Sequence, residues 1–172
     1  PKPEPEPESV DERAAWDAWG HYHLMTGLLL WHEAVGDDAA MDVATKMADL
    51  LCKVVGNDPE KLHRMTVYSD PSSTTKPPPL RYSGVNAVII DSMAWLFRIT
   101  GTARYQQFCL ACLQEWQLPH SPDFLRQTLK GVHYFQLSSG GPRWECLHTV
   151  MSLAELAWST GNQEYATALN DI

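Results

Sequence analysis

The stretch from Pro142 to Tyr165, PRWECLHTVMSLAELAWSTGNQEY, has the features of a complete helix and of the turn that follows it. Pro142 suits the first helical position, where a backbone N–H would have no partner. The residues from Val150 to Trp158 are apolar with a period of about 3.6 residues, as in an amphipathic helix. Gly161 can close this helix in a left-handed conformation, and Asn162 can cap the next one. The stretch therefore predicts a helix from about Pro142 to Gly161, followed at once by a second helix.

The same ending occurs three times along the chain, roughly every 60 residues. In each case an apolar helical pattern runs into a glycine that is followed by a capping residue, and the three pairs are Gly36-Asp37, Gly101-Thr102 and Gly161-Asn162. Such recurrence is typical of stacked helix pairs. We therefore predict three antiparallel helical hairpins, at about residues 12–55, 83–117 and 142–172.

The two helices of a predicted hairpin differ in pattern. The first helix, from Asp11 through the run Leu28 to Trp31, is apolar on nearly all sides, which is typical of a helix inside a bundle. The second helix is amphipathic, and its residues expected to point inward are Met41, Ala44, Met47, Leu50 and Leu51. Inner first helices and outer second helices describe a solenoid or an arc of an α/α toroid. Because aromatic and histidine residues gather at the starts of the inner helices, we predict an all-α fold in which residues 11–172 form about half of an (α/α)6 toroid.

Two other segments have different patterns. Residues 1–10 begin PKPEPEPE, an alternation of proline and charge that can bury nothing and predicts an extended, disordered tail. Residues 56–82 are rich in proline and serine and predict one long loop. A loop of that length within a compact domain is either a functional edge or a surface excursion.

Composition and charge limit the function classes. The chain has 172 residues, of which 44% are hydrophobic and 20% charged, as expected for one globular domain. The net charge is −8, and half of that excess lies in residues 1–12, so we expect no nucleic-acid partner. No apolar run approaches the roughly 18 residues of a membrane span, and no signal-peptide pattern occurs, so we expect no membrane partner and assign no localisation.

Four cysteines, Cys52, Cys109, Cys112 and Cys146, lie on predicted helices among apolar residues. In such surroundings a cysteine is usually a small hydrophobic core residue. Cys109 and Cys112 have CxxC spacing, but no second pair or histidine cluster completes a zinc site. We therefore expect neither a metal nor another cofactor in this chain.

Several polar and aromatic residues near the starts of the inner helices are candidates for binding a sugar. Sugars present hydroxyl groups and flat apolar faces, so their sites combine aromatic rings with hydrogen-bonding side chains. Trp144 could stack on a sugar ring, as could Trp19 of the first helix. Four further candidates could hydrogen-bond hydroxyls, namely Tyr22, His23, Asn86 and His148. Taken singly, each of these residues is more often part of a core than of a binding site.

Glu145 is the candidate catalytic residue. It lies in the first turn of its helix, where the helix dipole alone explains an acidic residue, but it could also accept a hydroxyl hydrogen or act as a general acid. A glycosidase normally uses two carboxyl groups that flank one bond. The sequence does not identify the second, for which Asp91 is a weak candidate.

Several segments resemble one known family. They are YHLMTGLLLWHEAVGDDAA, SGVNAVI, FLRQTLKG and PRWECLHTV followed by LAELAWSTGN, at residues 22–40, 83–89, 124–131 and 142–162. In this order they are similar to the β-L-arabinofuranosidase-like glycoside hydrolases, a family with a six-hairpin (α/α)6 toroid. The similarity spans most of residues 16–172. Its most specific parts are Tyr22-His23 and the cluster from Arg143 to His148.

The resemblance implies a sugar-binding funnel and hydrolysis of a furanosidic bond. It also implies a cysteine nucleophile held on zinc and a glutamate acid/base, but in a later part of the family's chain, around a Glu-x-Cys element. Glu145-Cys146 lacks that spacing, and the sequence ends at Ile172. We therefore expect a partial chain that contributes saccharide-binding residues, with zinc only in a longer parent. The expected partners are a saccharide and either the remainder of the toroid or another copy of the chain.

Two other functions remain open. A sugar epimerase or isomerase on the same toroid would use paired histidines for proton transfer. A helical-repeat interaction module would carry no chemistry.

Overall fold

The computed structural model describes residues 10–69, 74, 80–82, 84–118, 123–133, 136 and 143–170. Within these ranges the side chains of residues 10–17, 63–64, 66–69, 80–82, 84–85 and 143–146 are outside the description. The tail predicted for residues 1–10 therefore lies outside the described residues except for Val10, which is the first residue of a helix.

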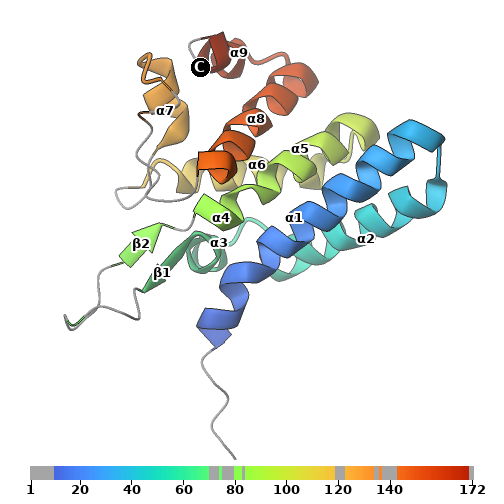
Figure 1. Ribbon diagram of the computed structural model, residues 1–172, viewed down its shortest axis with the longest axis horizontal. Helices are drawn as coiled ribbons and strands as arrows, with labels where there is room; N and C mark the ends of the chain where they lie inside the picture. The colour runs from blue at the N-terminus through green and yellow to red at the C-terminus, as the bar shows by residue number, and fades with distance from the viewer. Residues whose placement is uncertain are drawn as a thin grey trace, which may run out of the picture.

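The described part of the chain is helical apart from one small antiparallel ribbon, which confirms the predicted all-α class (Figure 1). In the ribbon, strand β1 pairs with strand β2 so that Val67 lies opposite Tyr82. The elements in chain order are α1 (Val10–Val35), α2 (Asp38–Val54), α3 (Pro59–Thr66), β1 (Val67–Ser69), β2 (Leu80–Tyr82), α4 (Gly84–Ala87), α5 (Ile89–Thr100), α6 (Ala103–Glu115), α7 (Phe124–Leu129), α8 (Arg143–Thr160) and α9 (Gln163–Asn170).

The three predicted glycine stops are confirmed. Gly36, Gly101 and Gly161 have φ angles of 73°, 65° and 69°, in the left-handed region that favours glycine. Each is separated from the next helix by one residue, so the chain reverses within a two-residue turn. The sequence therefore located the ends of α1, α5 and α8 correctly.

In two of the three turns, the residue after the glycine caps the next helix. Asp37 Oδ1 accepts the N–H groups of Ala39 at 2.9 Å and Ala40 at 3.3 Å. Asn162 Oδ1 accepts the N–H of Glu164 at 2.9 Å. The side chain of Thr102 makes no capping hydrogen bond, so its predicted role is wrong. The N–H groups of Thr102 and Asn162 each donate to the threonine hydroxyl two residues earlier at 3.2 Å, which holds both turns from the preceding helix.

Consecutive helices pack against each other across these turns. Contacts join α1 to α2, α5 to α6 and α8 to α9. Helix α5 also lies between α1 and α8 and contacts both, so these three helices run side by side (Figure 1). Helices α2 and α6 contact one another as well. The first helices of the three pairs therefore adjoin one another, and this brings their side chains together.

One core extends between the helices. Helix α5 supplies much of it, because every residue from Ile89 to Ala94 is buried. On α2 the buried residues Ala40, Ala44 and Ala48 recur every four positions, and small side chains at that spacing let two helices approach closely. Trp116 and Phe124 add an edge-to-face aromatic pair with ring centroids 5.5 Å apart.

The prediction that the first helix is buried on all sides is wrong. Tyr22, Met25 and Leu29 are buried, whereas Leu24 is 63% exposed and Trp31 55% exposed. Leu50 of α2, predicted to point inward, is 50% exposed as well. The elements that pack on α1, which include α2, α3, α4 and α5, leave Leu24 and Trp31 uncovered, so an apolar pattern all round does not produce burial all round. None of the described helices is both long and apolar enough to cross a bilayer.

The loop predicted for residues 56–82 contains regular structure. It includes α3 and both strands of the ribbon. Helix α3 begins at Pro59, and Asp58 Oδ1 accepts the N–H of Glu60 at 3.0 Å in the manner of a cap. Proline was interpreted as a loop signal, although a proline in the first helical position favours a helix. The helix predicted to start near Ser83 is also interrupted, because Val88 forms a turn between α4 and α5.

Candidate functional site

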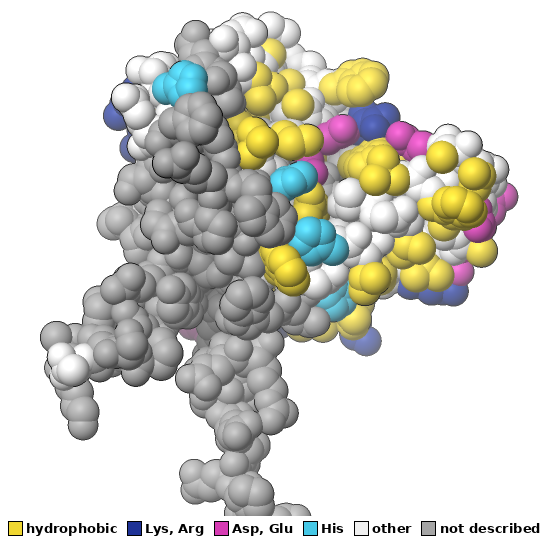
Figure 2. Space-filling view, in the orientation of Figure 1, with side chains coloured by type: hydrophobic (Ala, Val, Ile, Leu, Met, Phe, Trp, Pro, Cys, Tyr) yellow, Lys and Arg dark blue, Asp and Glu magenta, His cyan; other side chains and the backbone are white. Residues whose placement is uncertain are grey.

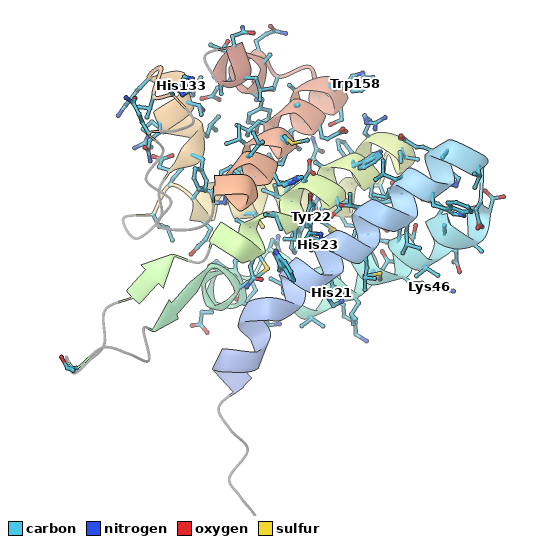
Figure 3. The ribbon with its side chains drawn as sticks, in the orientation of Figure 1. His21, Tyr22, His23, Lys46, His133 and Trp158 are labelled. Atoms are coloured by element: carbon cyan, nitrogen blue, oxygen red, sulfur yellow. The ribbon has the colours of Figure 1, made fainter. Side chains whose placement is uncertain are left out.

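A hydrogen bond between Tyr22 and His148 joins α1 to α8. Tyr22 Oη lies 2.6 Å from His148 Nδ1, and the two ring centroids are 5.5 Å apart. These residues are separated by 126 positions in the sequence. Figure 3 shows Tyr22 and its neighbour His23 on the part of α1 that lies beside α5. The fold therefore brings together three of the residues predicted for sugar binding.

The ionisation of this pair indicates which atom donates. Burial, and then the negative charge of Asp91, raise the pKa of Tyr22 to about 12. Burial, and then the positive charge of His23, lower the pKa of His148. Both side chains are therefore neutral at pH 7. Because a phenol is the better donor and an imidazole nitrogen the better acceptor, we assign the Tyr22 O–H as donor to Nδ1, which leaves the hydrogen of His148 on Nε2.

His23 lies beside this pair among aromatic rings. Its imidazole is exposed, and its centroid is 4.5 Å from the ring of Trp19 in an edge-to-face arrangement. The ring of Tyr22 lies 5.0 Å away. Figure 2 shows histidine and hydrophobic side chains next to one another on this face of the molecule. The surface thus combines hydrogen-bonding groups with flat apolar ones.

Asn86 does not join this group. It is fully buried in α4, and its Oδ1 accepts the backbone N–H of Trp19 at 3.2 Å. Its Nδ2 donates to the backbone carbonyl of Met65 at 2.8 Å. Both ends of the amide therefore bind backbone groups, which ties α4 to α1 and α3. This arrangement makes Asn86 a structural residue and not a ligand for sugar hydroxyls.

The remaining predicted residues, Trp144 and Glu145, belong to the first turn of α8. Their backbone precedes His148 by about one helical turn. Their side chains are outside the described residues, so the predicted stacking and acid roles stay predictions.

Two acidic residues lie near Tyr22 or near each other, since the charge of Asp91 acts on Tyr22 and that of Glu155 acts on Asp91, and the sequence identified only Asp91. Asp91, in the first turn of α5, is 7% exposed, and burial followed by the charge of Glu155 raises its pKa to about 7. Glu155 of α8 was missed. It follows His148 by seven residues, or about two turns, so that spacing on an inner helix could have indicated that both lie on one side.

Glu155 is held by an arginine that the sequence analysis also missed. Arg98 of α5 donates to Glu155 Oε2 at 2.6 Å and to Glu33 Oε1 at 3.3 Å. Its guanidinium lies 4.7 Å from the ring centroid of Trp158 and 5.9 Å from that of Trp95, within the range of cation–π attraction. This network joins α1, α5 and α8, which fixes the three helices that carry the candidate site.

The described cysteines are poorly suited to nucleophilic chemistry. Cys109 and Cys112 are buried, and burial raises both pKa values well above the ordinary range. Burial likewise raises the pKa of Cys52 to about 11. Because the thiolate is the reactive form, these three residues stay in the unreactive thiol form at neutral pH. Across the described ranges no three His, Cys, Asp or Glu side chains are grouped so as to hold a metal ion.

Tyr22→Phe is expected to shift the tautomer of His148 from Nε2–H towards Nδ1–H, with only a small loss of stability. The substitution removes one part-buried hydrogen bond, which typically contributes about 1 kcal/mol. It also removes the donor that keeps hydrogen off Nδ1, so the Nδ1–H tautomer should become populated. Imidazole 15N chemical shifts report the tautomer directly, and the exposed His133 is an internal control. Unchanged His148 shifts in the variant would show that Tyr22 does not set the tautomer.

Comparison of the chain with protein-family models, with curated proteins and with solved structures gives no match.

Proposed function

We propose that this chain supplies saccharide-binding residues to a β-L-arabinofuranosidase-like glycoside hydrolase. In this proposal the helix pairs α1–α2, α5–α6 and α8–α9 are hairpins that form about half of an (α/α)6 toroid, with α1, α5 and α8 inside. The observation that carries the proposal is the contact between Tyr22 and His148 beside the exposed His23. It joins the middle of α1 to the N-terminal third of α8, two proposed inner helices between which a funnel for a sugar would open.

The geometry suits recognition of hydroxyl groups. With Nδ1 accepting from Tyr22, His148 carries its hydrogen on Nε2 and is a neutral imidazole of the kind that binds sugar hydroxyls. His23 adds a second imidazole, and the ring of Trp19 lies against it with centroids 4.5 Å apart. A neutral donor fixed by a second side chain loses little freedom when it binds a ligand.

The carboxyl groups give this site acid–base capacity. The pKa of about 7 leaves Asp91 largely protonated below neutrality, and Glu155 is bound by Arg98. Glu145 stays the proposed general acid, and a zinc-bound thiolate nucleophile would be supplied by a further part of the toroid.

Titration with L-arabinose, followed by imidazole 15N and 1H NMR, tests the proposal. Sugar binding should shift the resonances of His23 and His148 in a saturable way, and His148→Ala should abolish the shift of His23. His133→Ala, which changes an exposed histidine next to the end of α7, should leave saturation unchanged. Equal, non-saturating shifts for His23, His148 and His133 would refute a saccharide site here.

A sugar epimerase or isomerase is the second candidate, favoured by the proximity of His23 and His148. The positive charge of His23 is close enough to lower the pKa of His148, as expected for two groups that exchange protons with one ligand. Incubation of aldoses with the protein in D2O separates the two functions. Deuterium incorporated at a sugar carbon would favour the epimerase, whereas saturable binding without incorporation would favour the hydrolase.

A further inference from the structure

The indole ring of Trp158, near the C-terminal end of α8, is held from one side and open on the other. Its side chain is 74% exposed, the highest fraction among the large hydrophobic residues in the described ranges. The guanidinium of Arg98 lies 4.7 Å from the ring centroid, within the range of cation–π attraction. One face of the ring therefore rests on Arg98, which leaves the opposite face for a ligand.

The same arginine holds two carboxyl groups beside this ring. Glu155 Oε2 accepts from Arg98 Nε at 2.6 Å, and Glu33 Oε1 accepts from Arg98 at 3.3 Å and from Trp95 Nε1 at 2.8 Å. The side chains of Glu33 and Glu155 are 43% and 20% exposed, so both are within reach of a ligand in solution. Each has a second oxygen that can accept a hydrogen bond from a hydroxyl group.

This combination favours a neutral ligand that carries hydroxyl groups. A cation on the open face of Trp158 would be repelled by the charge of Arg98 behind the ring, and an anion would meet two carboxyl groups against one guanidinium. A sugar residue has a flat C–H face that packs on an indole ring, and its hydroxyl groups donate to carboxyl oxygens. The surroundings of Trp158 therefore match a saccharide better than a charged ligand.

The position of Trp158 relies on the same helix that carries His148. Met151 follows His148 by three residues and is 44% exposed, and Trp158 follows Met151 by seven, so Met151 and Trp158 lie on one exposed side of α8. His148 and Trp158 are separated by roughly 15 Å along the helix axis. Figure 3 shows Trp158 near the end of α8, away from His23 on α1. A single sugar residue is too short to reach both places.

We propose that the open face of Trp158, together with Glu33 and Glu155, is a second saccharide subsite, which binds a distant residue of an oligosaccharide whose nearer residue lies at His148. The inference rests on the proposed function, since it assigns the substrate class of the same site as an oligosaccharide and not a monosaccharide. Arg98 is a positioning residue here, because it orients the ring and both carboxyl groups without touching the ligand.

Calorimetric titration with L-arabinose and with arabinohexaose tests the subsite. The wild type should bind the hexaose about tenfold more tightly than the monosaccharide, and Trp158→Ala should remove that gain while the dissociation constant for L-arabinose stays unchanged. Trp31→Ala is the matched control, because Trp31 is also an exposed tryptophan, 55% exposed, but its Nε1 donates to Asp37 in the turn after α1. It should leave both affinities unchanged, and circular dichroism establishes that each variant is folded.

The outcomes separate this subsite from the site at His148. Hexaose that binds no more tightly than L-arabinose, or a gain that survives Trp158→Ala, would overturn the subsite and leave the binding of L-arabinose at the histidines intact. No saturable binding of either sugar would refute the proposed function, and the subsite with it. A saturable shift of the Trp158 indole 15N resonance with tetramethylammonium but not with the hexaose would assign the ring to a cation and overturn the saccharide subsite.

Discussion

Asp91→Asn is expected to raise the free energy of unfolding at pH 8 by roughly 2–4 kcal/mol. Asp91 is 7% exposed and has no cationic partner among the groups that act on its charge. The rise of its pKa from 3.8 to about 7 therefore measures the cost of holding a buried carboxylate. A neutral asparagine of the same shape removes that cost.

The stabilisation should depend on pH in a defined direction. Below about pH 4 Asp91 is protonated in both the folded and the unfolded chain, so the two proteins should differ little. Between about pH 4 and pH 7 the folded state binds more protons than the unfolded state, so the stability of the wild type falls as pH rises. Above pH 7 the full cost is present. The expected difference therefore grows from pH 4 to pH 7 and is then constant.

Urea denaturation at a series of pH values measures this difference. Other groups near Asp91 change the absolute stability as well, since Tyr22, Glu155 and Cys109 each interact with its charge. Subtracting the wild-type curve from that of the variant isolates the contribution of Asp91. Asp42→Asn, at an exposed position paired with Lys46, is the control and should give a flat difference near zero. A flat difference for Asp91→Asn as well would mean that its carboxylate is solvated in the folded protein.

Asn86→Ala is expected to lower the free energy of unfolding by roughly 2–4 kcal/mol. The substitution leaves the carbonyl of Met65 without its buried donor and opens a small cavity between α1, α3 and α4. Asn170→Ala, at the exposed C-terminal residue of α9, should have little effect. Chemical denaturation with both variants gives the comparison.

The same pair of variants separates two roles for Asn86. If Asn86 is structural, its loss should lower stability while the affinity of the remaining folded protein for L-arabinose changes little. If it binds a sugar hydroxyl, affinity should fall and stability should stay near that of the wild type. The second result would contradict the hydrogen bonds to Trp19 and Met65.

The sequence alone located the ends of helices because those ends depend on one or two residues. Gly36, Gly101 and Gly161 adopt the left-handed conformation that glycine favours, and their positions follow directly from the pattern. The cap at Asp37 was predictable for the same reason. The missing cap at Thr102 has no such local explanation, because the Asn162 turn has the equivalent bond to Thr160 Oγ1 and Asn162 still caps the next helix.

Burial could not be predicted to the same degree. The first helix is apolar on most sides, but exposure depends on which neighbours pack against it, and α2, α3, α4 and α5 leave part of its surface uncovered. Leu50 and Leu51 are adjacent and chemically identical, yet one is half exposed and the other is buried. Only the position of the neighbouring helices distinguishes them.

For the candidate site, too, the sequence predicted some features and could not predict others. Tyr22, His23 and His148 could be named from the sequence because they are polar residues within apolar helices, although Tyr22 and His23 lie in the middle of α1 and not at its predicted start. Their contact, the burial of Asp91 and the use of both ends of Asn86 for backbone groups involve residues far apart in the chain. Local sequence determined where α1, α5 and α8 end, because the conformation of a helix-ending glycine is a property of a few neighbouring residues. Tertiary structure alone decided which polar groups meet and which are desolvated, because distance and dielectric environment depend on how α1, α5 and α8 pack.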